Sequence, residues 1–139
     1  MENERGYVLI RHTGRMEVVK CNDKLDFSRI REAIGCEYLE PVYLEDRLVM
    51  LVDDAGKMNG LPVNPMATIL YESVATDFIV GNAVIVTIEN GDLECLELER
   101  AERLAKKWMV LGKSKGYHAY VTVEGKNDKG SEGRKNQEA

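Results

Sequence analysis

The 139-residue chain carries 24 acidic and 19 basic residues, a formal net charge of −5 at pH 7 and an apolar share of 44%. These values are typical of a folded globular protein of one-domain size, long enough to bury a core without disulfides or metals. The acidic balance argues against nucleic acid as a direct partner, because such binding rests on Lys and Arg. Residues 1–10 predict neither a signal peptide nor a membrane anchor, so no membrane partner is expected.

The first 35 residues predict a hairpin and a short helix. Residues 6–12 and 15–21 are apolar and β-branched on either side of a turn-like segment, which is typical of two antiparallel strands. Asp26 can cap a helix over 27–34, and Gly35 is suited to end it.

A second hairpin is predicted over 36–44 and 47–52. Pro41 places the first of these strands at a sheet edge or at a bulge, because proline cannot donate to a strand ladder. The segment 53–65 is dense in turn residues and is predicted to be a long irregular connection. A helix over 66–71 should follow it.

The last third of the chain predicts a buried strand, a long helix and a final strand. Residues 78–88 form the most apolar stretch, and Gly81-Asn82 within it implies a bend or bulge. Apolar residues keep helical spacing over 97–111, with Gly112 as the stop, and alternation returns over 117–124.

These elements predict an α+β fold with a mostly antiparallel sheet, open to strong curvature at the bend and covered by two or three helices. We expect a single domain over residues 1–125. Residues 126–139 lack large apolar side chains and are predicted to be a disordered tail.

The cysteines and histidines indicate no reactive or metal site. Cys21, Cys36 and Cys95 are odd in number, far apart and without a C-x-x-C pair, so a reducing cytoplasm is the simplest setting. His12 and His118 lie near no nucleophile motif. We therefore expect no catalytic residues, no metal and no cofactor.

Three sequence blocks in the middle of the chain occur in a specific order. The first block is the strand pair at 38–42 and 48–52. It is followed by the Asn-Gly-Leu-Pro-Val-Asn loop at 59–64 and by Phe-Ile-Val-Gly-Asn at 78–82. Their order over about 15–95 resembles the family called domain of unknown function 3846, found in bacterial, plasmid and phage proteins. The helix after Leu96 lies outside this resemblance. The resemblance implies a small accessory domain of mobile elements and supplies no catalytic residues to carry over.

Candidate binding residues lie on the long loop and at the predicted bend. Asn59 and Asn64 offer side-chain amides, and long loops on a scaffold commonly carry binding functions. Gly81 would let a ligand approach the backbone closely, and Asn82 offers both a donor and an acceptor. Turn chemistry and a β-bulge explain the same residues without a ligand. The predicted ligand-binding set is Lys57, Asn59, Gly60, Asn64, Gly81 and Asn82.

Three classes of function are compatible with these features. The first is a non-enzymatic accessory binding module of a bacterial or phage mobile element, which binds a host protein or a small ligand. The second is a small enzyme that acts on a nucleotide-like metabolite through carboxylates such as Glu40, Asp53 or Asp77. The third is a structural domain that forms a homo-oligomer through Trp108 and the Pro41 strand. We predict the first, because no catalytic constellation is present.

Overall fold

The computed structural model describes residues 4–21, 24–72 and 77–124. These residues form eight strands and three helices around one mixed, mostly antiparallel sheet, which confirms the predicted α+β class. The tail predicted at 126–139 lies outside the described residues. In chain order the elements are β1 (Arg5–Ile10), β2 (Arg15–Cys21), α1 (Phe27–Ile34), β3 (Leu39–Tyr43), β4 (Leu48–Asp53), α2 (Pro65–Tyr71), β5 (Ala83–Glu89), β6 (Asp92–Glu94), β7 (Leu96–Glu97), α3 (Leu98–Ser114) and β8 (Tyr120–Val123).

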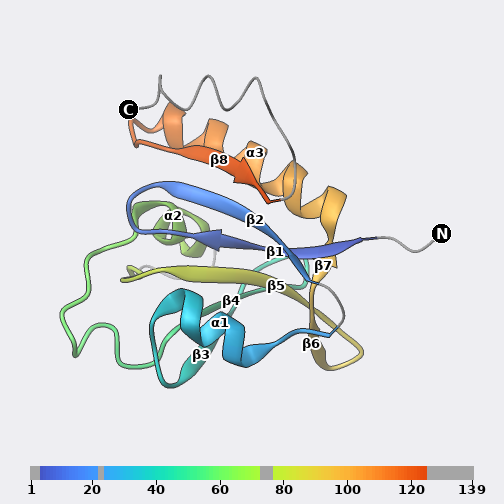
Figure 1. Ribbon diagram of the computed structural model, residues 1–139. Coiled ribbons are helices and arrows are strands. Elements are labelled where there is room, and N and C mark those ends of the chain that lie inside the picture. Colours follow the sequence, from blue (N-terminus) through green and yellow to red (C-terminus); the bar gives the residue numbers. More distant parts are fainter. Residues whose placement is uncertain (1–3, 22–23, 73–76, 125–139) are drawn as a thin grey trace.

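The sheet is open: β3 forms one edge and β8 forms the other (Figure 1). Its order is β3-β4-β5-β1-β2-β8, while β6 pairs with β5 and β7 pairs with β1. All pairs are antiparallel except β2 with β8, which follows the α3 crossover. The bend at Gly81 does not close the sheet into a barrel, since β3 and β8 remain at opposite edges.

Local sequence signals place α1 as predicted. The carboxylate of Asp26 accepts hydrogen bonds from the backbone N–H groups of Ser28 and Arg29, which satisfies donors at the helix start. Gly35 ends the helix at φ 85°, a left-handed conformation that glycine adopts without steric cost.

Pro41 protects one edge of the sheet. The Leu44 N–H donates to the Leu48 carbonyl at 2.9 Å, and the Asp54 N–H donates to the Tyr38 carbonyl at 3.0 Å. Even-numbered residues of β3 therefore turn their backbone groups toward β4, and Pro41 turns its ring nitrogen toward the free edge. The predicted edge position is confirmed, and the missing N–H interrupts the row of donors that another strand would need.

The strand predicted over 78–88 begins later than expected. Gly81 adopts φ 76° and turns the chain, so β5 starts at Ala83. Before the turn, Val80 makes only an isolated bridge to Val63 of the long loop. The predicted bend at Gly81 is thus a break between two short segments.

Gly112 was predicted to end the last helix and instead lies inside α3, which continues to Ser114. It is buried against the side chain of Met66 in α2, so the absence of a Cβ allows the two helices to approach closely. The last strand is also shorter than predicted, because β8 spans only four residues. The short strands β6 and β7 were not predicted.

Helices cover both faces of the central strands, which explains why residues 83–86 of β5 are all apolar and buried (Figure 1). On one face, α2 and α3 pack against inward-facing residues such as Ile85, and the predicted packing of Trp108 on its own sheet is confirmed. On the other face, Ile30 and Ile34 of α1 pack against residues such as Val86. No helix in the described part of the chain is long and apolar enough to cross a membrane.

A disulfide joins Cys21 to Cys95, 74 positions apart in the sequence. The expectation of a reducing compartment rested on cysteines that are distant in sequence, but the sheet brings these two together. Cys21 is opposite Arg5 in the β1–β2 register, and Cys95 precedes β7, whose Glu97 is also opposite Arg5. Cys36 remains a free thiol.

Val86→Asp should lower the free energy of unfolding by several kcal/mol, about 3 or more, because it places an unpaired charge in a fully buried position. Val110→Asp is the matched control, since Val110 is 64% exposed on α3 and the same change there should cost less than about 1 kcal/mol. Urea denaturation followed by circular dichroism measures both. Equal midpoints for the two variants would contradict the assignment of the core.

Gly14→Ala should destabilise the fold far more than Gly91→Ala. Both glycines have positive φ, at 101° and 85°. A Cβ at Gly14 would collide with the backbone carbonyl of His118, whereas at Gly91 it would meet open space. We expect about 1 kcal/mol of strain at Gly91 and at least twice that at Gly14. Thermal unfolding of the two variants measures this difference. Similar melting temperatures would show that the close approach of the His118 carbonyl to Gly14 does not require a glycine there.

Candidate functional site

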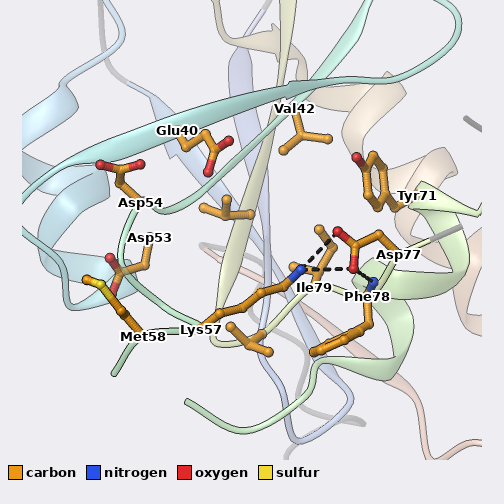
Figure 2. Close-up of a pocket in the computed structure, with 12 residues that line it drawn as sticks. Glu40, Val42, Asp53, Asp54, Lys57, Met58, Tyr71, Asp77, Phe78 and Ile79 are labelled. Atoms are coloured by element: carbon orange, nitrogen blue, oxygen red, sulfur yellow. Dashed lines mark hydrogen bonds and ion pairs between the residues drawn. The ribbon is translucent and has the colours of Figure 1, made fainter. Parts of the chain in front are cut away.

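A pocket of about 330 Å³ lies on the face of the sheet beside the edge strand β3. On this face, α3 covers the strands toward the opposite edge, β1, β2 and β8. The β3 edge is left less covered, and Val42 of β3 is only partly buried. The walls come from β3, the end of β4, the loop that follows, α2 and the segment before β5 (Figure 2). The lining residues are Glu40, Val42, Val52, Asp53, Asp54, Lys57, Met58, Tyr71, Asp77, Phe78, Ile79 and Val80.

The base of the pocket is apolar. Val52, Ile79 and Val80 are buried, and Val42 and Tyr71 are half-buried beside them. Phe78 is 45% exposed, which leaves an aromatic ring available at the pocket wall. These side chains offer an apolar surface on which the body of a small ligand can rest.

Lys57 is the only base among the lining residues, and its charge is already paired. Its Nζ lies 2.9 Å from both carboxylate oxygens of Asp77 and 4.4 Å from the centre of the Phe78 ring. The Lys57 hydrogen bond, with a second from the Phe78 N–H, lowers the pKa of the exposed Asp77 carboxyl below its ordinary value. Asp77 is therefore ionised at neutral pH, and the pair is lost only as pH falls through that lowered pKa.

Three further carboxylates line the pocket without a cationic partner in the described ranges. Figure 2 shows Glu40, Asp53 and Asp54 on one side of the pocket and the Asp77–Lys57 pair on the other. Asp53 accepts a hydrogen bond of 2.9 Å from the Ala55 N–H, which fixes its position at the end of β4. No group of three or more His, Cys, Asp or Glu side chains in the described residues could hold a metal ion together. The carboxylates instead give the pocket a distributed negative charge.

Of the predicted binding residues, only Lys57 lines this pocket. Asn59 and Gly60 are exposed on the long loop, which is folded by its own turns: the Gly60 N–H donates to the Lys57 carbonyl at 3.2 Å. Gly60 has φ 69°, as a turn glycine requires. The structure gives both residues turn roles and places neither on the lining.

The other three predicted residues have structural roles: Asn64 and Gly81 are buried, and Asn82 is half-buried. Asn64 is 0% exposed, and its amide nitrogen donates to the carbonyls of Ile10 at 3.0 Å and Gly81 at 2.8 Å. Its side-chain oxygen accepts from the Ala67 N–H and caps α2. Asn82 accepts a hydrogen bond of 3.1 Å from the His12 N–H at the β1–β2 turn. The amides that suggested ligand contact are bonded to the protein's own backbone.

Three of the lining carboxylates, Glu40, Asp53 and Asp77, were named in the sequence as candidates of the enzyme hypothesis. The structure places Glu40, Asp53 and Asp77 on one pocket, although they are far apart in the chain. The β3–β4 hairpin carried part of this signal, since Glu40 pairs with Val52, next to Asp53. Tyr71 and Phe78 also line the pocket. Their positions depend on how α2 packs against the sheet, and no local sequence pattern specified that packing.

Asn64→Ala should lower the free energy of unfolding by about 2 to 4 kcal/mol, because it removes a helix cap and leaves buried carbonyls unpaired. Asn59→Ala removes the same group from an exposed loop position and should change stability by less than about 0.5 kcal/mol. Chemical denaturation of both variants tests the structural role. Equal stabilities would show that the Asn64 bonds contribute nothing net.

Comparison with known proteins identifies the family. The family model for the domain of unknown function DUF3846 matches residues 5–109, whereas no curated protein and no solved structure matches the chain. The match extends beyond the 15–95 region of the sequence resemblance and includes β1 and most of α3, which corrects the earlier boundary. The matched region also contains every residue that lines the pocket. The chain belongs to the DUF3846 family.

Proposed function

We propose that this domain is a non-enzymatic binding module and that its pocket binds a small organic cation with an apolar body. The observation that carries the proposal is that the only lining base is paired with Asp77, while Glu40, Asp53 and Asp54 have no cationic partner among the described residues. In keeping with the family resemblance, we place the module on a bacterial or phage mobile element. We keep the cytoplasm, which the sequence analysis expected from the cysteine pattern, as its compartment.

Size and charge favour this ligand class over others. A volume of about 330 Å³ is at the small end of the range of ligand pockets, which suits a compact molecule. An anion would face three carboxylates with only the paired Lys57 to receive it, which is electrostatically unfavourable. A primary amine or guanidinium can donate to separate carboxylates while its carbon chain rests on Val52 and Ile79.

The enzyme hypothesis remains as a second candidate, because Glu40, Asp53 and Asp77 line the same pocket. Acid–base catalysis usually pairs a base with a carboxyl whose pKa is raised so that it can donate a proton. The pKa of Asp77 is lowered by Lys57 and Phe78, so Asp77 is suited to a fixed ion pair and not to proton donation. This direction favours binding over catalysis.

The oligomer hypothesis is less well supported by the contacts first suggested for it. Trp108 is 5% exposed and packs inside its own core, and Pro41 interrupts the edge of β3. A homo-oligomer would therefore need other contacts. Native mass spectrometry of the purified chain would reveal one directly.

Calorimetric titration at low salt with agmatine, spermidine and phenethylamine tests the cation site. Glu40→Gln and Asp54→Asn should each weaken binding of the best of these probes by about tenfold, the effect of losing one charge-assisted hydrogen bond. Glu32→Gln is the matched control: it makes the same charge change on α1, away from the pocket, and should leave affinity within about twofold.

Two results would contradict this function. Phenylacetate binding as tightly as phenethylamine would show that the carboxylates do not select the ligand. Turnover of a bound metabolite that disappears in Glu40→Gln would establish the enzyme hypothesis in place of the binding module.

A further inference from the structure

The pocket beside β3 already holds one ammonium group, which belongs to Lys57. Its Nζ lies 2.9 Å from both carboxylate oxygens of Asp77 and 4.4 Å from the centre of the Phe78 ring. A carboxylate beside the face of an aromatic ring is a favourable environment for an ammonium, because both attract positive charge. Asp77 and Phe78 therefore form an ammonium subsite, and Figure 2 shows the Lys57 side chain extended toward it.

The subsite persists without Lys57. The Phe78 N–H donates to Asp77 Oδ1 at 2.7 Å, and this bond favours the ionised carboxylate whether or not the lysine is present. The side chain of Asp77 is 47% exposed, and Phe78 is 45% exposed. Both groups are thus within reach of a ligand that enters the pocket.

The Lys57–Asp77 pair is open enough to water to exchange. The Lys57 side chain is 49% exposed, and ion pairs of this kind contribute little to stability because solvent and salt screen them. The backbone of Lys57 is held separately, since its carbonyl accepts a hydrogen bond of 3.2 Å from the Gly60 N–H. The side chain can therefore move into water while the loop keeps its fold.

The opposite side of the pocket calls for a second cation. Glu40, Asp53 and Asp54 lie there without a cationic partner in the described ranges, and the Asp77 subsite is across the pocket from them (Figure 2). A single ammonium satisfies only one of the two sides. A linear molecule with an ammonium at each end satisfies both and lays its carbon chain on the apolar base between them.

We propose that the ligand is a linear aliphatic diamine and that one of its ammonium groups replaces that of Lys57 at Asp77 and Phe78. This assignment rests on the cation-binding function proposed above. The second ammonium binds the carboxylates on the opposite side. In the free protein Lys57 fills the subsite, so it acts as an internal competitor that lowers the affinity of the pocket for the diamine.

Calorimetric titration with 1,5-diaminopentane at low salt tests this exchange. Lys57→Met should tighten binding of the diamine by about threefold or more, because the competing ammonium is removed. Lys106→Met removes the same charge from an exposed position on α3 and should leave the affinity within about twofold. Circular dichroism verifies that each variant is folded.

Phe78→Leu separates occupation of the subsite from a general effect of charge, since it changes no charge. In the unmodified chain the ring contacts an ammonium before and after binding, so its loss should change the diamine affinity by less than about twofold. In the Lys57→Met chain the ring meets an ammonium only when the diamine binds. Its loss there should weaken binding by about threefold or more.

Two results would overturn the diamine subsite while Glu40→Gln still weakens binding and the proposed function stands. Unchanged or weaker diamine binding in Lys57→Met would show that the lysine does not compete for the ligand's position. An equal loss from Phe78→Leu in both backgrounds would show that the ring serves only as an apolar wall. If no amine binds to any variant, the cation-binding function fails, and the subsite fails with it.

Discussion

The side chain of Asn64 joins three parts of the chain on which the pocket depends. One amide connects the end of β1, the turn at Gly81 and the first turn of α2. These contacts are buried, so each would leave an unsatisfied polar group if the side chain were lost. They fix where α2 begins and where β5 departs, and hence where Tyr71 and Phe78 stand relative to the sheet. Asn64, which the sequence suggested for ligand contact, thus helps to hold the walls of the pocket beside β3.

The two cavities lie on opposite faces of the sheet and differ in chemistry. The pocket beside β3 combines an apolar base with four carboxylates and one paired amine, which suits reversible binding of a cation. The groove of about 630 Å³ beside the start of α1 is lined by two bases, Arg5 and Lys24, and two acids, Asp92 and Glu94, so its charge is balanced. Alternation of side chains along the strands separates them, because neighbouring residues of β4 and β5 point to different cores. Changes at one cavity can therefore be made without touching the other.

Elements with strong local signals could be predicted from the sequence, and features that depend on distant packing could not. Asp26 and Gly35 bound α1, and Pro65 begins α2, because capping and backbone preference act within a few residues. Gly112 was misread because a glycine that ends a helix and one that lets two helices touch look alike in sequence. The pocket walls and the disulfide needed the strand order, since both join residues separated by large stretches of chain.

The parallel pairing of β8 with β2 determines where material attached to the chain would stand. β8 lies at one edge of the sheet and β3, which lines the pocket, lies at the other (Figure 1). An affinity tag, a fluorophore or a fused partner joined directly to the end of β8 would start from the edge opposite the pocket beside β3. Immobilisation through that edge would leave the pocket facing the solution, whereas a label on Glu40 of β3, which lines the pocket, would block it. The fold thus has a natural orientation on a sensor surface.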